Sequence, residues 1–436
     1  MTVRTRVSLI LTGTFAALDL RRCGTLLRRI AGDRRGNAGI VIAAGFPLLI
    51  GAAGLAVDAV QWVMQKREVQ AAADSAALAG VYGLIDSEDM DGAVNNSLAR
   101  DKTVPANANI QATQSPPGHD TDPFAVTVRL VVPARTTFAS MFMKHPLAIT
   151  AEATATIVEN GKYCAFALGA VDDSGVVIRP NTNVEMECGI ATNSSSAKAV
   201  DADGSSSLKS PSIIAYGGVD SGGPIQDSRV RAHGLTQDDP LENTEPPLIP
   251  NTGCPNATVN AGGEETVLQP GCYANMNLNG NVRLQDGEYI LNKGNFVVGP
   301  QAHLECDACT IFLTSESAAT DPGSIGKVKI SSDATVKLNA TREGPDAGIL
   351  FYQDRHATSD LPGDENRVGG NSFSTLSGLL YFPSETLYLD GNMSADVQCT
   401  RLLAKRLVFA GRVYISKKCD GLGRMTFAAS EVRLIG

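Results

Sequence analysis

The amino-acid sequence predicts a mainly β protein with one membrane-spanning helix near its N-terminus and a large exported domain. Residues 39–57 contain no charged side chain, and strand-sized apolar runs separated by Gly, Asn and Asp recur from Tyr163 onward. Charged residues make up only 19% of the chain and glycine occurs 43 times, which favours extended, turn-rich structure over a helical globule. The 436 residues are enough for two or three domains.

Charge is distributed unevenly along the chain. The formal net charge is −9, but residues 1–38 hold eight arginines against Asp19 and Asp33, a local charge of +6 that leaves −15 for the rest. An arginine-rich stretch is compatible with nucleic-acid binding, but this one has no interleaved aromatic residues and an apolar segment follows at once. We therefore expect the basic head and the acidic body to face different compartments.

The uncharged segment Gly39–Val57 reads GIVIAAGFPLLIGAAGLAV. Its nineteen residues would extend about 30 Å as a helix, the thickness of a bilayer's hydrocarbon core. Pro47 is compatible with this prediction because proline is tolerated in membrane helices. Arg34 and Arg35 precede the segment and Asp58 follows it. The positive-inside rule then predicts a cytoplasmic N-terminus and an exported remainder.

The chain divides into five expected regions. Beyond the span, residues 58–100 are rich in Ala, Gln and Glu and contain no Pro, which predicts that the helix continues as a stalk. The regions are a basic cytoplasmic head at 1–38, a transmembrane helix at 39–57, a periplasmic helical stalk at 58–100, a small membrane-proximal α+β sheet region at 101–160 and a β-solenoid-like exported domain at 161–436.

Two sets of residues on the predicted helix are candidates for packing. Gly51 and Gly54 have no side chain, so they would let a second membrane helix approach closely. Trp62 suits an anchor at the membrane interface.

Beyond the span, one apolar stripe should pack against another element. The stripe consists of Val57, Val60, Met64, Ala71 and Leu78.

The exported domain is predicted to be a right-handed β-helix, a β-solenoid in which successive coils stack and bury an interior ladder. Runs such as GNVRLQDGEYIL, GNFVVGPQAHLEC and GKVKISSDATVKLNA look like successive coils, and no helical periodicity separates them. A β-sandwich is the alternative. Residues 217–270 predict a long excursion because they are rich in proline and include Pro240, Pro246, Pro247, Pro250 and Pro255.

The segment from Arg34 to Gly80 strongly resembles the N-terminal segment of the TadE/TadG-like proteins of tight-adherence (Flp) pilus systems. The matching features are Gly36, the uncharged span, the exit GLAVD at 54–58 and the run QAAADSAALAG at 70–80. The resemblance implies an inner-membrane, periplasm-facing structural or assembly component of a Flp pilus in a Gram-negative bacterium. It also implies other Tad components as partners in that membrane, together with pilin, secretin or an envelope glycan.

Two features of that family group differ here. Processed pseudopilins carry Glu five residues after a cleaved Gly, whereas Val41 follows Gly36 and Ala44 follows Gly39 at this spacing, so we expect no cleavage. Many TadG-like proteins also carry a metal-binding Asp-x-Ser-x-Ser after a buried strand. The one match in this sequence, residues 203–207, follows AKAVDA, and a Ser-rich turn explains it better than a metal site.

Eight cysteines fall in the predicted exported part, and Cys23 falls in the head. An even number in an oxidising compartment favours disulfides. The Cys306-Asp307-Ala308-Cys309 motif would also fit a redox site or half of a zinc site, but the sequence holds no second CxxC, which favours a structural disulfide. Pairing between sequence neighbours gives Cys164–Cys188, Cys254–Cys272, Cys306–Cys309 and Cys399–Cys419.

The sequence predicts a structural protein rather than an enzyme. It contains no Gly-x-Ser-x-Gly elbow and no P-loop, and its five histidines are isolated, so we expect no catalytic, cofactor-binding or metal-binding residues. The alternative is a membrane-anchored β-helix protein that binds or cleaves envelope or extracellular polysaccharide with carboxylates on one face. The candidates, which equally fit a solvated loop, are Asp333, Asp354, Arg355, Asp360, Asp364 and Glu365.

Overall fold

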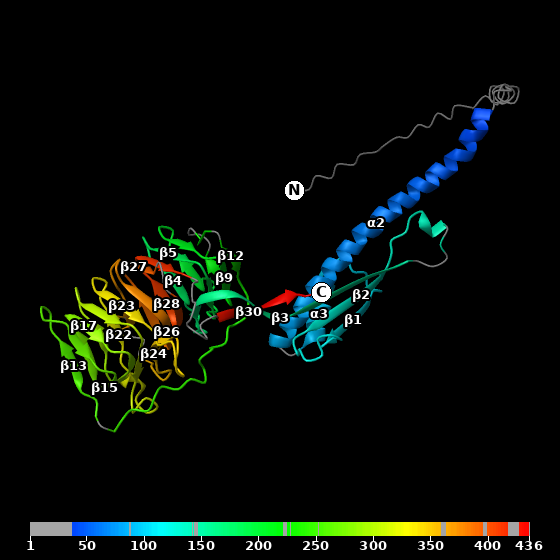
Figure 1. Ribbon diagram of the computed structural model, residues 1–436. Helices are drawn as coiled ribbons and strands as arrows, with labels where there is room; N and C mark the ends of the chain where they lie inside the picture. Colours follow the sequence, from blue (N-terminus) through cyan, green and yellow to red (C-terminus); the bar gives the residue numbers. More distant parts are fainter. Residues whose placement is uncertain are drawn as a thin grey trace, which may run out of the picture. The chain divides into compact units, whose positions relative to one another are not determined.

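The computed structural model of the chain (Figure 1) describes most of the protein beyond the basic head. The chain forms two compact units, which we describe separately: residues 89–114 and 126–154 join the long N-terminal helix in the first, and most of the chain from Ala155 onward forms the second. The described residues are 37–86, 89–141, 143, 147–220, 225–226, 228–251, 253–358, 363–395, 399–416 and 427–435. Nearly all of the predicted head, with Cys23, lies outside them, as does Cys419.

The first unit begins with one continuous helix, α2 (Asn37–Asp86), of 50 residues. It includes the predicted span and the first part of the predicted stalk, and Pro47 lies within it. Among the described residues, α2 is the one helix long and apolar enough to cross a membrane. The remainder of the predicted stalk is a separate helix, α3 (Met90–Arg100), whose first turn is capped by the side chain of Asp89.

A small sheet follows the helices. Strand β1 (Asn109–Gln114) pairs antiparallel with β2 (Val126–Pro133), and β2 pairs with the 20-residue strand β3 (Ala148–Ala167). Buried and exposed residues alternate along β2, as expected for a strand with one face in a core. A short 3-10 helix, η1 (Ala139–Met141), lies in the connection between β2 and β3. The boundary between the two units falls within β3, at residues 154 and 155.

The buried face of α2 differs from the predicted stripe. Val57, Val60 and Met64 of that stripe are 47%, 56% and 60% exposed. The wholly or almost wholly buried residues beyond the span are mostly small, because α3 and β2 lie close to the helix: Val69, Ala72, Ala73, Ala76, Ala77 and Val81. A Cβ atom on Gly80 would lie 2.8 Å from Cγ1 of Val126. Close packing against small side chains therefore determines the buried face.

The second unit consists mainly of short parallel strands. From β13 to β23, each strand pairs in parallel with the third strand after it along the chain, as β13 does with β16, β14 with β17 and β15 with β18, and further on the long strands β26 and β28 each pair with more than one earlier strand. The strands of this part are β13 (Asn256–Val259), β14 (Thr266–Leu268), β15 (Gly271–Tyr273), β16 (Asn275–Leu278), β17 (Asn281–Leu284), β18 (Gly287–Asn292), β19 (Phe296–Val298), β20 (His303–Cys306), β21 (Cys309–Thr314), β22 (Val328–Ile330), β23 (Thr335–Asn339), β24 (Ile349–Gln353), β25 (Asn366–Val368), β26 (Thr375–Leu389), β27 (Asn392–Ala395), β28 (Thr400–Phe409) and β29 (Arg412–Ile415), with a 3-10 helix η2 (Pro322–Ser324).

The earlier strands of this unit also pair in parallel with the third strand after them, and they lie beside the last strands of the unit. Strand β28 pairs in parallel with β3 and β4, and β29 pairs with β5, so the last part of the chain lies directly beside the first. The order of pairing is therefore not the order of the sequence. These strands are β4 (Val176–Ile178), β5 (Asn183–Met186), β6 (Gly189–Thr192), β7 (Val200–Ala202), β8 (Ser207–Lys209), β9 (Ser212–Ala215), β10 (Val219–Asp220), β11 (Ile225–Gln226) and β12 (Arg229–Arg231). The final strand, β30 (Phe427–Leu434), pairs antiparallel with β3.

Alternate residues of these strands form two separate apolar clusters. Tyr289, Ile311 and Phe351 are in register in one cluster, and their neighbours Ile290, Phe312 and Tyr352 are in register in the other. This alternation is the period of two expected for strands. Glycines permit the close approach of successive turns: a Cβ atom on Gly294 would lie 1.3 Å from the carbonyl oxygen of Ala274. Such positions explain part of the high glycine content.

Residues 232–255, which lie between β12 and β13, are the part of the predicted excursion that contains no strand among the described residues. Leu241 and Ile249 from this segment pack against the second apolar cluster. The Tyr352 hydroxyl donates to the carbonyl of Thr244, and burial raises the pKa of Tyr352 to about 12, so the hydroxyl keeps its proton in the physiological range. The segment thus covers an apolar surface that the strands alone would expose to water.

Candidate functional site

The candidate site lies on α2 where the predicted span ends. Asp58 is completely buried, and its carboxylate accepts hydrogen bonds from three successive backbone N–H groups. They belong to Thr137 (2.9 Å), Phe138 (2.8 Å) and Ala139, just before and at the start of η1. Several N–H donors stabilise the charged carboxylate and offset the cost of burying it. Asp58 therefore attaches the β2–β3 connection to the helix.

One and two turns further along α2, side chains bind the end of β2. Gln65 is 4% exposed, and its amide group both donates to the carbonyl of Pro133 (3.0 Å) and accepts from the N–H of Arg135 (2.8 Å). The indole N–H of Trp62 donates to the carbonyl of Arg135 (3.0 Å). Backbone groups of this irregular segment that lack a strand partner are thus paired by helix side chains.

Further along α2, side chains on the same face bind the backbone of β3. Lys66 donates to the carbonyl of Thr150, and the side-chain amide of Gln70 donates to the carbonyl of Glu152 at 2.7 Å. Asp58, Trp62, Gln65 and the pair Lys66 and Gln70 are spaced so that they share one side of a helix. We call these five residues, Asp58, Trp62, Gln65, Lys66 and Gln70, the polar seam.

The two glycines that the sequence predicted for helix packing, Gly51 and Gly54, have different surroundings in the structure. A Cβ atom on Gly54 would lie 2.6 Å from Cγ of Phe138, so this glycine receives an aromatic side chain of its own chain. Among the residues that the structure describes, no heavy atom lies within 4 Å of the same test position on Gly51. The space beside Gly54 is therefore filled by Phe138 rather than left for a second helix, which corrects our expectation for this residue.

Replacing Gly54 by Leu should displace Phe138 and detach the connection from the helix. The larger side chain cannot share the space with the ring, and overpacking of this kind typically costs about 1–3 kcal/mol. We expect tryptic cleavage after Arg135 to become roughly tenfold faster in membranes that contain this variant. Gly51→Leu, the matched control, should be cleaved like the wild type.

A compensating change separates this cause from a general defect. In the Gly54→Leu/Phe138→Ala double variant the ring is gone, so part of the protection should return. Equal cleavage of the Gly54 and Gly51 variants would contradict the packing that the structure shows.

A comparison with protein-family models identifies this region of the chain. Residues 36–86 match the model described as putative Flp pilus-assembly TadE/G-like. Helix α2 is therefore similar to the TadE/G-like family segment. No curated protein and no solved structure matches the chain. The match confirms the resemblance seen in the sequence, and it coincides with α2 (Asn37–Asp86) almost residue for residue.

The TadE/G-like segment therefore contains the whole polar seam and the small residues that pack against α3 and β2. Sequence reasoning took the apolar stripe as the packing face and missed the seam. Two signals could have indicated it. Asp58 and Gln65 are seven residues apart, which places them on one helix face, and an acidic side chain at the end of an apolar span needs a partner if it is buried.

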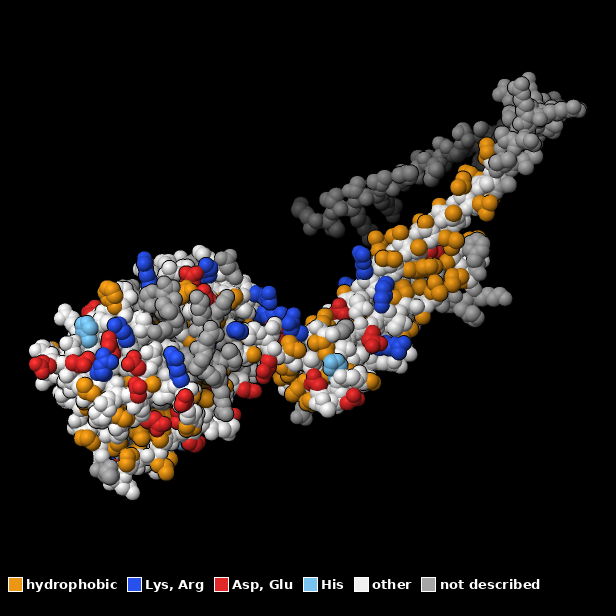
Figure 2. All heavy atoms as spheres, viewed as in Figure 1, with side chains coloured by type: hydrophobic (Ala, Val, Ile, Leu, Met, Phe, Trp, Pro, Cys, Tyr) orange, Lys and Arg blue, Asp and Glu red, His pale blue; other side chains and the backbone are white. Residues whose placement is uncertain are grey.

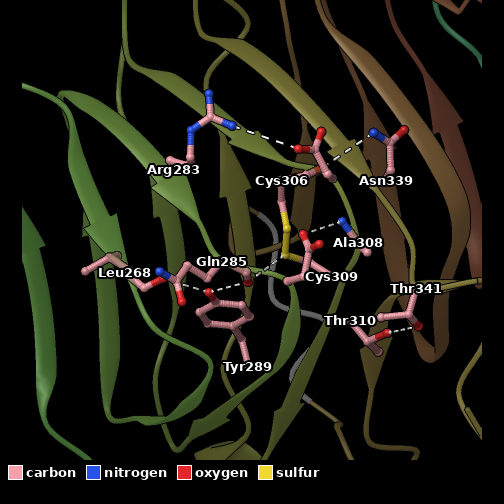
Figure 3. Close-up of a disulfide and its surroundings, with 12 residues drawn as sticks. Leu268, Arg283, Gln285, Tyr289, Cys306, Ala308, Cys309, Thr310, Asn339 and Thr341 are labelled. Carbon is pink, nitrogen blue, oxygen red and sulfur yellow. Dashed lines mark hydrogen bonds and ion pairs between the residues drawn. A yellow bond between two sulfur atoms is a disulfide. The ribbon is translucent and has the colours of Figure 1, made fainter. Parts of the chain in front are cut away.

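The structure pairs six of the predicted exported cysteines as Cys164–Cys188, Cys254–Cys272 and Cys306–Cys309, which are the sequence-neighbour pairs. Cys399 is also disulfide-bonded, while its expected partner Cys419 lies outside the described residues. The Cys306–Cys309 bridge connects the end of β20 to the start of β21, and both cysteines are almost completely buried (Figure 3). Burial and pairing in a strand corner favour a structural role over redox exchange, which needs an accessible sulfur.

The Asp-x-Ser-x-Ser match lies in the turn between β7 and β8. Asp203 accepts hydrogen bonds from the backbone N–H and the hydroxyl of Ser205, both at 3.1 Å, and its own carbonyl accepts from Ser206. These bonds within the segment form the Ser-rich turn that the sequence suggested. Among the described residues, no group of three or more His, Cys, Asp or Glu side chains is arranged to hold a metal ion.

The carboxylates proposed for polysaccharide chemistry are engaged in several different contacts. Asp354 is 3% exposed and accepts from the hydroxyl of Thr314 at 2.7 Å, while Asp364 pairs with Lys329 at 2.7 Å. Arg355 donates to the carbonyl of Leu241 in the segment 232–255. Asp333 lies in the turn between β22 and β23, Glu365 precedes β25, and Asp360 lies outside the described residues. The side chains of Asp354, Asp364 and Arg355 thus hold strands and loops together.

Proposed function

We propose that this chain is a structural component of Flp (Tad) pilus assembly that α2 anchors in the inner membrane, with its N-terminus in the cytoplasm. The observation that carries the proposal is the TadE/G-like match over residues 36–86, which coincides with a helix able to cross a membrane. Arg34 and Arg35 before the span support this orientation under the positive-inside rule. The β body would then lie in the periplasm, where disulfides form.

The body, in this proposal, is a right-handed parallel β-helix with a structural role. Pairing of each strand with the third strand after it supports three strands per coil. Parallel pairing differs from the antiparallel sheets of a β-sandwich. The right hand follows the general preference of connections between parallel strands. We assign the body a structural role rather than a catalytic one, since Asp354 and Asp364 among its acidic candidates bind other parts of the body.

Other Tad components in the membrane are the proposed direct partners of α2. Helix α2 exposes apolar residues just after Asp58, and Figure 2 shows hydrophobic side chains along the helix. Val60 and Val63 are both 56% exposed. Apolar residues just beyond a span suit packing against a like helix of another membrane protein.

The test is pilus assembly in a strain that lacks this chain. We expect surface Flp pili to disappear and to return when the wild-type chain is supplied. A matched chain in which residues 39–57 are replaced by an unrelated membrane span should insert but restore few pili, because the helix surface that contacts partners is changed. Normal piliation of the deletion strain would contradict the proposal.

A further inference from the structure

The connection between β2 and β3 carries exposed apolar side chains close to the predicted membrane span. Met141 is 78% exposed, Met143 is 37% exposed and Leu147 is 40% exposed. Phe138 from the same connection packs on Gly54 of α2. Large apolar side chains on a surface loop are unfavourable in water, so their position requires an explanation.

Contacts with α2 show how deep this connection reaches. The carbonyl of Arg135 is level with Trp62, the three N–H groups that follow are level with Asp58, and the ring of Phe138 reaches Gly54. Each of these steps is four residues of helix, or about 6 Å. From Arg135 to Phe138 the connection therefore approaches the span by about 12 Å and reaches its last uncharged turn.

Backbone pairing in this part of the connection suits a medium poor in water. A loop that enters a bilayer must have its N–H groups paired within the protein, because lipid chains offer no acceptor. Asp58 supplies an acceptor for the N–H groups of Thr137, Phe138 and Ala139. Its complete burial at the end of an apolar span is explained if it pairs the backbone of a segment that enters the membrane.

We propose that the β2–β3 connection inserts Met141 and Met143 into the half of the bilayer from which Asp58 emerges, beside α2. The occupant of this apolar surface is lipid, because Leu55 and Val57, next to Gly54 and on different sides of α2, are also apolar and are 46% and 47% exposed at the end of the span. The chain would thus be anchored in the membrane by α2 and by a second, shallower contact. This second contact would fix the rotation of α2 about its own axis. The inference rests on anchoring by α2 and not on any pilus partner.

The experiment uses the single tryptophan of the chain. In a Trp62→Phe background, one tryptophan is placed at Met141, and the full chain is reconstituted into phosphatidylethanolamine and phosphatidylglycerol vesicles that contain acyl-chain-brominated lipid. Leu48→Trp in the same background reports on the span, since Leu48 is 75% exposed on α2. Phe373→Trp reports on the body, since Phe373 is 73% exposed there.

We expect bromine to quench the Met141→Trp variant at least half as strongly as the Leu48→Trp variant, with blue-shifted emission, and to leave Phe373→Trp unquenched. Quenching of Leu48→Trp with a Met141→Trp signal equal to that of Phe373→Trp would overturn the inference and point to a protein partner on this surface. Absence of quenching at Leu48 would overturn the anchoring itself. Neither result depends on pilus assembly. Failure of this inference is therefore distinguishable from failure of the proposed role in pilus assembly, which the deletion strain tests.

Discussion

Substituting Asn for Asp58 should release the β2–β3 connection from α2. An asparagine keeps one acceptor oxygen but presents an amino group to N–H donors, so at least one of the three hydrogen bonds is lost and the charge assistance disappears. We expect the backbone amides of Thr137, Phe138 and Ala139 to exchange at least about tenfold faster, which corresponds to the loss of one hydrogen bond to a charged group. Hydrogen–deuterium exchange of the chain in lipid nanodiscs measures this directly.

Glu68→Gln is the control for this substitution. Glu68 is an exposed carboxylate on the same helix, so its replacement changes the charge equally and should leave the exchange of residues 137–139 unaltered. Unchanged exchange in Asp58→Asn would show that the carboxylate does not hold the connection and would remove the physical basis of the polar seam.

A second large effect is expected inside the β body. Lys327 and Glu385 form an ion pair whose side chains are 4% and 1% exposed. Glu385 also accepts hydrogen bonds from Gln353 and Asn366, both at 2.8 Å. It enters the interior where β26 bulges, because three residues of β26, 383–385, lie opposite one residue of β28. Glu385→Ala should destabilise the body by about 3–5 kcal/mol, because it leaves a buried charge without its main partner.

Two further variants make this prediction specific. Lys327→Met/Glu385→Leu removes both charges and should lose much less stability than Glu385→Ala alone. Glu185→Gln breaks the Lys209–Glu185 pair, whose side chains are about half exposed, and should cost at most about 1 kcal/mol. Thermal unfolding of the full chain ranks the variants, and equal midpoints for Glu385→Ala and Glu185→Gln would contradict the buried network.

The long apolar helix was predictable from sequence because a run of apolar residues without charge is a strong local signal. Its packing face was not predictable to the same extent. Val60 and Met64 are apolar and fit a helical stripe, but packing against β2 and α3 selected the smaller residues such as Ala72 and Ala76. Asp58 likewise looked like a charge that ends the span, and only the structure shows its three backbone donors.

The strands of the body were visible in the sequence, whereas their order of pairing was not. Glycine and asparagine mark the turns, and alternate residues such as Tyr289 and Ile290 face different clusters. The pairing of β28 with β3 joins Leu402 to Ala165, more than two hundred positions apart. Local propensity does not encode such a contact between distant residues. The contact depends on the point along the body to which the segment 232–255 leads the chain before β13 begins a new set of paired strands.

Protease accessibility in spheroplasts, with a tag after Gly436, tests the proposed orientation and anchoring. We expect protease added outside the inner membrane to remove the tag and digest the β body, while an epitope placed before Arg34 stays protected and sediments with the membrane. A tag that survives unless the inner membrane is opened would place the body in the cytoplasm. That result would contradict the orientation, the periplasmic disulfides and the role proposed in pilus assembly.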